Sequence, residues 1–303
     1  MKRKSGYTIL IGGILMGAAL FSGCKGASKP EPAAVQTAAP AAPVKIGDET
    51  AMLLKDLNDN GDYVNSKEFP SLIKASVVFE KLGPKHLVVA IRPPTAFAPG
   101  HIKGAVSKKF EDLPAYFESG IKPFAYDKII LVSDDGQVAA YTTCLLRLMG
   151  YGNVYALRWG MSSWNKSFAD AGWLQAVKTD FEDKLDTSVA SMPVAASMPE
   201  LTTGKTTGAD IGADRFASVF KDGTGSVMID AATVFADPST YYIINYERKD
   251  KYEAGHIPGA VRYKPDGTLG IVSEMATIPM DKTVVVYCGT GHNSGFVTAY
   301  LRL

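Results

Sequence analysis

The sequence has 303 residues, a formal net charge of +1 at pH 7 and a hydrophobic fraction of 46%. A chain of this length suggests roughly two domains, and its near-neutral charge argues against a nucleic-acid partner. Three widely spaced cysteines, Cys24, Cys144 and Cys288, exclude a disulfide framework. The four histidines lack metal-ligand spacing, so the sequence predicts neither a metal site nor a cofactor.

Residues 1–24 have the pattern of a bacterial lipoprotein signal peptide. A positive start (Met1-Lys2-Arg3-Lys4) precedes an apolar stretch over 7–21, and Ser22-Gly23-Cys24 follows. We expect Cys24 to be lipidated, which gives a membrane-anchored, periplasm-facing protein of the bacterial cell envelope. An ordinary secretory signal with a chance cysteine is the alternative.

Two stretches are predicted to connect domains rather than to fold. Residues 25–61 begin with an Ala/Pro-rich run that is expected to act as a tether. Residues 179–222 contain Ala-Ser-Met-Pro twice and are expected to be a linker. Residues 56–62 begin like a calcium loop, but Lys67 stands where its bidentate acid belongs, which favours a plain polar turn.

The remaining segments, 62–178 and 223–303, are the two predicted domains. In the first, β-branched runs at 87–91 and 128–132 alternate with helical segments, which indicates a parallel sheet covered on both faces. Cys144 lies in one such helix and is expected to be a small core residue.

The second domain repeats the first. The element Gly-His-Ile-x-Gly-Ala-Val at 100–106 recurs at 255–261, an offset of 155 residues. At the same offset Ser133 matches Cys288 and Gly136 matches Gly291. One offset across separate landmarks predicts a tandem duplication.

Cys288 is the candidate nucleophile. A β-branched run over 284–286 precedes it, a polar loop follows, and a helix is predicted over 296–301. Backbone N–H groups converge in such a loop at a helix start, which favours a thiolate and a bound anion. The candidate binding residues of the loop are Gly289, Thr290, Gly291, His292, Asn293 and Ser294.

These motifs, with the segment 150–164 (Gly-Tyr-Gly-Asn-Val to Trp), resemble the rhodanese family of sulfurtransferases. The resemblance implies an α/β fold of two tandem rhodanese-like domains, each a small parallel sheet flanked by helices. It also implies a thiosulfate sulfurtransferase-type enzyme. Cys288 would take a sulfane sulfur from thiosulfate or a similar small anion as a persulfide and pass it to a thiol or cyanide.

Both copies depart from the family pattern. Ser133 replaces the cysteine in the first copy and two aspartates follow it, so that copy is predicted to be inactive. In the second copy, Asn245-Tyr246-Glu247 stands where the family often has Asp-x-Arg, and Arg248 is a candidate replacement cation. His292 is expected either to assist the thiolate as a cation or to face solvent. The paired His101 and His256 are expected to brace a turn.

The sequence stops at the equivalent of Leu148, so we expect a truncated second domain that lacks a strand and a helix of the first. Two other functions stay open. One is a cysteine phosphatase, although Ser294 occupies its arginine position. The other is a non-catalytic sulfur-binding or interaction lipoprotein built from rhodanese-like domains.

Overall fold

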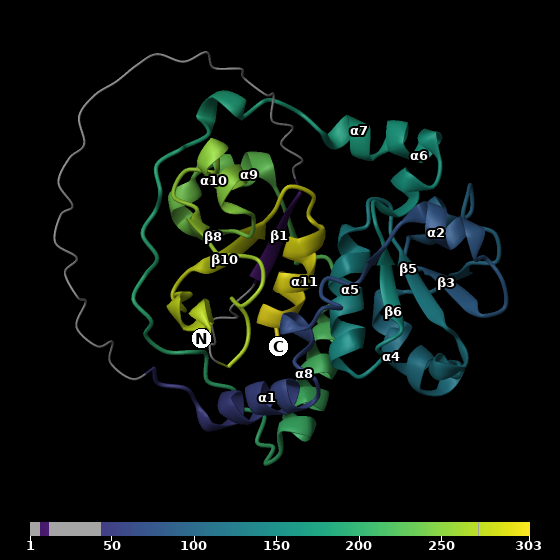
Figure 1. Cartoon of the computed structure of the whole chain (residues 1–303), viewed down its shortest axis with the longest axis horizontal. Coiled ribbons are helices and arrows are strands. Elements are labelled where there is room, and N and C mark those ends of the chain that lie inside the picture. The colour runs from purple at the N-terminus through teal and green to yellow at the C-terminus, as the bar shows by residue number, and fades with distance from the viewer. Residues whose placement is uncertain (1–6, 12–43, 272) are drawn as a thin grey trace.

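The computed structural model describes residues 7–11, 44–271 and 273–303. Two α/β lobes lie side by side, and helices α5 (Gln137–Leu148) and α11 (His292–Leu301) pack against each other between them (Figure 1). Each lobe contains a five-stranded parallel sheet with helices around it. The α/β architecture and its duplication are therefore confirmed.

The first sheet has the strand order β2-β6-β5-β3-β4. Its central strands β5 and β3 are buried over 129–132 and 88–90, which explains the apolar residues at these positions. Their register places Val89 beside Leu131. The strands are β2 (Leu72–Ile73), β3 (His86–Ala90), β4 (Val106–Ser107), β5 (Lys128–Val132) and β6 (Val154–Leu157). The short helices of this lobe are α2 (Ala75–Glu80), α3 (Pro94–Phe97), α4 (Leu113–Ala115), α6 (Lys166–Ala171) and α7 (Trp173–Ala176).

The second sheet has the order β7-β1-β10-β8-β9, which matches the first sheet position by position. Strands β8 (Tyr241–Asn245), β9 (Val261–Arg262) and β10 (Thr283–Tyr287) are offset by 155 residues from β3, β4 and β5. Strand β7 (Met228–Asp230) corresponds to β2. Helices α9 (Ala231–Ala236) and α10 (Lys249–Ala254) belong to this lobe.

Strand β1 (Tyr7–Ile11) occupies the place that β6 has in the first sheet. It pairs in parallel with β10 on one side and with β7 on the other, with Thr8 beside Val285 and Leu10 beside Ile229. The expectation that the second sheet lacks a strand is therefore wrong. A gap would leave backbone N–H and C=O groups unpaired along both neighbours, and a strand from far away in the sequence satisfies them as well as a local one.

Strand β1 lies inside the segment predicted to be a signal peptide, whereas Cys24 falls outside the described residues. Lipid anchoring stays a prediction. Among the residues that the structure describes, no helix combines the length and apolar character needed to cross a bilayer.

Two helices lie inside the segments that composition assigned to a tether and a linker. Helix α1 (Asp48–Asp59) buries Leu53, Leu54 and Leu57, and α8 (Gly208–Asp222) packs against it. Apolar residues at helical spacing build this contact although the surrounding sequence is polar or Pro-rich. The predicted tether and linker thus do not extend over the whole of 25–61 and 179–222.

The calcium-like stretch forms a polar turn at the end of α1. The Nδ2 atom of Asn65 donates hydrogen bonds to both carboxylate oxygens of Asp62, at 2.8 and 2.9 Å. Asp59 pairs with Lys55 one helical turn earlier. The carboxylates of Asp59 and Asp62 thus already have partners within this stretch, which agrees with the plain polar turn that the sequence favours.

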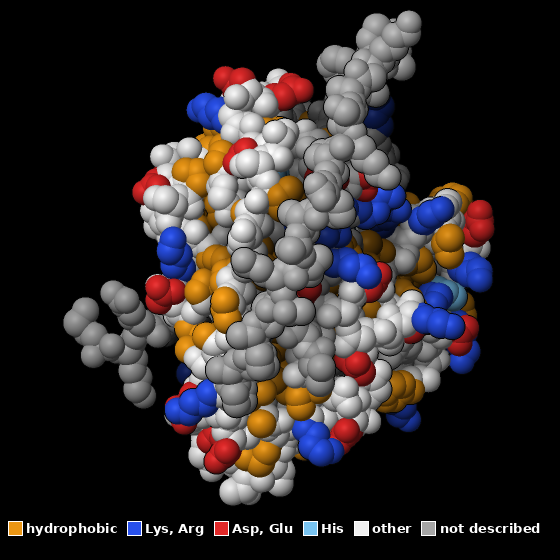
Figure 2. All heavy atoms as spheres, turned by 60° about the vertical axis from the view of Figure 1, so that its left-hand side comes forward, with side chains coloured by type: hydrophobic (Ala, Val, Ile, Leu, Met, Phe, Trp, Pro, Cys, Tyr) orange, Lys and Arg blue, Asp and Glu red, His pale blue; other side chains and the backbone are white. Residues whose placement is uncertain are grey.

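Helices α5 and α11 approach most closely at Gly295. A Cβ atom at this glycine would lie 3.0 Å from the Gln137 carbonyl oxygen and 3.2 Å from the Ala140 Cβ. Gly295 and Ala140 are themselves related by the offset of 155 residues. Small residues at the crossing point let the two copies share one apolar core. On the surface, the face shown in Figure 2 carries charged side chains of both signs spread over it.

Candidate functional site

The loop between β10 and α11 begins with Cys288, directly after the last residue of the strand. Gly291 ends the loop as the residue before the helix, with φ of 76° and ψ of −9°. Its counterpart Gly136 has φ of 89° and ψ of −7° before α5. A glycine is favoured here because the left-handed backbone conformation is strained for residues with a Cβ atom.

The sulfur of Cys288 lies at the N-terminal end of α11. The backbone N–H of Ser294 donates to Sγ at 3.4 Å, and the Ser294 hydroxyl oxygen lies 3.6 Å from it. Only 3% of the Cys288 surface is exposed. The first turn of α11 therefore offers hydrogen bonding and a favourable dipole to a sulfur anion at this position.

The first copy holds a different atom in the same cradle. The N–H of Ala139 donates to the Ser133 hydroxyl oxygen at 3.2 Å, and that of Gly136 donates to it at 3.1 Å. Ala139 follows Ser133 by the same six positions that separate Ser294 from Cys288. The alignment of Ser133 with Cys288 is thus reproduced in three dimensions. Only the second copy has a sulfur atom at this position.

Glu247 closes one side of the Cys288 loop. The N–H of Gly289, the residue after the cysteine, donates to the Glu247 Oε1 atom at 2.7 Å. A Cβ atom at position 289 would lie 2.9 Å from that oxygen, so glycine permits the close approach. From its sequence position Glu247 is only a departure from the family pattern, and nothing local to it predicts this contact with a residue 42 positions later.

The equivalent contact in the first copy is an ion pair. Arg92, which is related to Glu247 by the offset of 155 residues, donates from Nε to Asp134 at 2.5 Å and from Nη1 to the Gly100 carbonyl oxygen at 2.9 Å. Asp134 in turn matches Gly289. We call this contact between the loops after the first and second central strands the loop bridge: Arg92–Asp134 in copy one and Glu247–Gly289 in copy two.

His292 points into the first copy and is 99% buried, with 1% of its surface exposed. Its Nε2 atom lies 3.1 Å from both the Trp159 N–H and the Asp135 carbonyl oxygen, and Nδ1 lies 2.8 Å from the Thr290 hydroxyl. Burial lowers the pKa of His292 to about 4, and the nearby Arg158 acts in the same direction.

The expected roles of His292 are therefore both wrong. A ring that is neutral at pH 7 supplies no positive charge to the thiolate, and a buried ring does not face solvent. The sequence could not predict this burial, because the Trp159 and Asp135 backbone groups that contact the ring lie more than 130 residues earlier in the chain.

Arg248 lies beside the loop but interacts elsewhere. Its Nη2 atom pairs with Asp250 at 2.9 Å, and the two side chains are 70% and 63% exposed. The electrostatic attraction within such an exposed ion pair is largely screened by water. Of the remaining predicted loop residues, Thr290 and Asn293 are partly buried, while Gly289 is exposed.

Comparison with known proteins identifies the family of both copies. The family model described as rhodanese-like domain matches residues 78–167 and 231–303, which together make up more than half of the chain. The chain belongs to the rhodanese-like domain family. The first matched region contains Ser133 and the second contains Cys288, so the rhodanese-like copies coincide with the two lobes.

Several solved structures are similar to parts of this rhodanese-like protein. A rhodanese-related protein from Thermoplasma volcanium aligns with 18% identity over 34% of this chain and 93% of its own, with a TM-score of 0.28. A protein from Anabaena sp. aligns with 22% identity over 34% and 88%, with a TM-score of 0.27. Thiosulfate sulfurtransferase from Pseudomonas aeruginosa aligns with 16% identity over 82% of this chain and 44% of its own, with a TM-score of 0.30. No curated protein matches the sequence.

The paired histidines of the rhodanese-like repeat have the predicted bracing role. The Nδ1 atom of His256 lies 2.7 Å from the Tyr252 carbonyl oxygen, and that of His101 lies 3.1 Å from the Phe97 carbonyl oxygen. Each ring also stacks on the aromatic ring four residues before it. The same contact in the serine copy and in the cysteine copy indicates a structural function.

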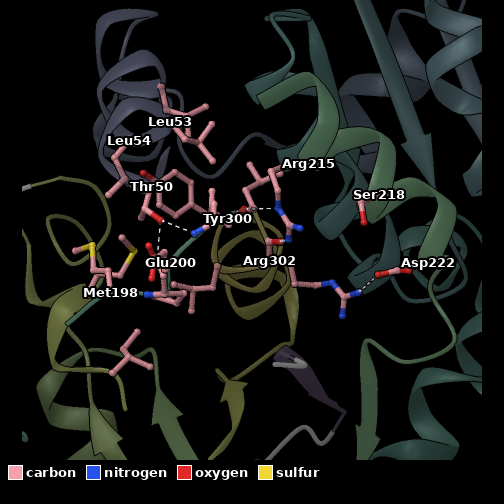
Figure 3. A pocket seen from close by; sticks show the side chains of 17 residues that line it. Thr50, Leu53, Leu54, Met198, Glu200, Arg215, Ser218, Asp222, Tyr300 and Arg302 are labelled. Carbon is pink, nitrogen blue, oxygen red and sulfur yellow. Dashed lines mark hydrogen bonds and ion pairs between the residues drawn. The ribbon is translucent and has the colours of Figure 1, made fainter. Parts of the chain in front are cut away.

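A cavity of about 450 Å³ lies away from Cys288, among α1, α8 and the end of α11 (Figure 3). Its wall is largely apolar, and Arg215 donates to the carbonyl oxygens of Arg302 and Leu303 at 2.8 Å. A second hollow of about 540 Å³ lies around Asn60 and Arg147. Neither cavity is lined by residues of the cysteine loop.

Proposed function

We propose that this protein transfers sulfane sulfur through a persulfide on Cys288. The thiolate attacks the outer sulfur of a donor, the donor's S–S bond breaks, and the leaving group departs with the electron pair. A nucleophilic acceptor then attacks the outer sulfur of the persulfide, and the Cys288 thiolate is released. The sulfur moves without net oxidation, and the steps call for no cofactor.

The observation that carries this proposal is the contact between Cys288 Sγ and the first turn of α11. The Ser294 N–H donates to the sulfur, and the helix N-terminus favours negative charge there. Both the thiolate and the persulfide are anions, so the same donors stabilise the resting enzyme and the intermediate. Membership in the rhodanese-like family supports the same chemistry.

The first copy serves as a scaffold in this proposal. Its cradle holds a serine hydroxyl, which cannot carry a transferable sulfur, and the Arg92–Asp134 loop bridge closes its rim. Its α5 packs against α11, and its Asp135 and Trp159 backbone groups hold His292 of the second copy. Loss of catalysis in one copy thus leaves its contribution to the site of the other intact.

The test is mass spectrometry of the purified full chain after incubation with thiosulfate or methanethiosulfonate. We expect one added sulfur atom on the peptide that contains Cys288, and a fall in transfer to cyanide by a factor of about 1000 or more in Cys288→Ser.

Cys144→Ser is the matched control. Cys144 is fully buried in α5, and burial raises the pKa of its thiol, so it stays protonated and out of reach. This variant should keep the added sulfur. Equal transfer by wild type and Cys288→Ser, or no added sulfur from either donor, would refute the proposal and leave a non-catalytic module.

A further inference from the structure

The carboxylate of Glu247 stands where the negative end of a sulfur donor would approach the Cys288 loop. Its Oε1 atom accepts the Gly289 N–H at 2.7 Å, so one of the loop's own anion-binding groups is already occupied by a fixed negative charge. Glu247 is partly exposed, whereas Cys288 is buried. A donor that approaches the Gly289 N–H therefore meets this carboxylate.

None of the neighbouring basic side chains forms an ion pair with this carboxylate in the described part of the chain, although the Arg262 guanidinium lies close to the Glu247 backbone. Arg248 pairs with Asp250, and Lys249 pairs with Glu253, both on the exposed face of α10. Arg262 donates from Nε to the backbone carbonyl oxygen of Glu247 rather than to its carboxylate. Within the described part of the chain, the Glu247 carboxylate forms no ion pair.

Residues 289–294 contain no lysine or arginine, although Arg158 of the first copy lies close enough to His292 to lower its pKa. His292, the loop's one ionisable side chain besides the cysteine, is neutral at pH 7 because it is buried. The Cys288 thiolate of the proposed mechanism would add a second negative charge nearby. Electrostatic repulsion at short range then disfavours donors in proportion to their negative charge.

The two copies show that the loop bridge itself does not require an acid at this position. In copy one the bridge is made by a cation, Arg92, with an aspartate opposite. In copy two the charge is reversed and the opposite residue is a glycine that contributes only its N–H. The reversal occurs in the copy that carries the cysteine.

We propose, on the basis of the sulfur-transfer function above, that Glu247 selects the donor by charge. It disfavours dianionic thiosulfate and favours a sulfane-sulfur donor that carries an ammonium group near the reacting sulfur. The ammonium group pairs with the Glu247 carboxylate while the Cys288 thiolate attacks the outer sulfur. For a thiosulfonate donor, the S–S bond breaks and the sulfinate leaves with the electron pair.

Three donors with the same reacting bond test this selectivity. Thiosulfate carries two negative charges, methanethiosulfonate carries one, and 2-aminoethanethiosulfonate carries one together with an ammonium group. The rate of persulfide formation on Cys288 is measured for each in single turnover by quenching and mass spectrometry. We expect the wild type to react fastest with the ammonium donor and slowest with thiosulfate.

Glu247→Gln removes the charge and retains an oxygen that can accept the Gly289 N–H. We expect this variant to change the ratio of the two rates, ammonium donor over thiosulfate, by about tenfold toward thiosulfate. Glu253→Gln is the control, because it removes one acid from the neighbouring helix without a contact to the loop. It should leave the ratio unchanged.

A ratio that is the same in wild type and Glu247→Gln would overturn the inference and leave Glu247 as a structural tie between loops. An equal change in Glu253→Gln would also overturn it, since general surface charge would then explain the effect. If Cys288 takes sulfur from none of the three donors in any variant, the proposed function fails and this inference fails with it.

Discussion

The burial of His292 predicts that this rhodanese-like protein loses stability in mild acid. The ring is held between the two copies, with a folded-state pKa of about 4 against an ordinary value of 6.5. Because the pKa of His292 is lower in the folded state, between pH 6.5 and pH 4 the unfolded chain binds a proton at this residue and the folded chain does not. The stabilising contribution is complete above pH 6.5 and is lost as the pH falls from 6.5 to 4.

The size of the effect follows from the two pKa values. A difference of one pKa unit corresponds to about 1.4 kcal/mol, so the loss amounts to about 3 kcal/mol when the pH reaches 4. This is a large share of the stability of an ordinary domain. Asp135 has the opposite tendency, since burial raises the pKa of its carboxyl and its contribution to stability grows as the pH falls.

The comparison of wild type with His292→Gln separates these groups, because Asp135 is present in both. Denaturant unfolding is measured at intervals between pH 7.5 and pH 4. We expect the stability advantage of wild type over the variant to shrink by about 3 kcal/mol across this range. A constant difference, or an NMR titration of the His292 ring near pH 6.5, would contradict the reasoning.

Two further predictions concern glycines at the junction of the copies. Gly136→Ala should cost more than about 2 kcal/mol, because the new Cβ would lie 2.8 Å from the Leu157 carbonyl oxygen at a backbone φ of +89°. Gly150→Ala is its control: it has φ of +98° but no atom within 4 Å of the Cβ, so we expect only about 1 kcal/mol. Gly295→Val should cost about 2 to 3 kcal/mol by forcing α5 and α11 apart. Thermal unfolding measures all three, and a Gly136→Ala variant no less stable than Gly150→Ala would contradict the first.

Much of the fold could be predicted from local patterns in the sequence. The apolar runs at 128–132 and 284–286 became central strands β5 and β10, because strands buried on both faces need apolar residues throughout. The offset of 155 residues also predicted which segments would take equivalent places. Helices α1 and α8 were missed because their apolar stripes lie in polar or Pro-rich surroundings.

The candidate site was predicted only in part. The loop and its cysteine could be found from the order strand, cysteine, glycine-containing loop and helix, which depends on nearby residues alone. The repeat offset relates Arg92 to Glu247 and Asp134 to Gly289, but the Arg92–Asp134 contact is itself visible only in the structure. The Glu247–Gly289 contact is between residues 42 positions apart, and local sequence contains no record of it.

The sequence by itself determined the duplication, the α/β class and the place of the one cysteine that follows a central strand, since these depend on periodicity and on spacing along the chain. Only the tertiary structure decided that Tyr7–Ile11 completes the second sheet, that His292 is neutral and that an acid borders the cysteine loop. The physical reason is common to all three. Backbone pairing, desolvation and charge depend on which groups lie within a few ångströms, and folding brings those groups from distant parts of the chain.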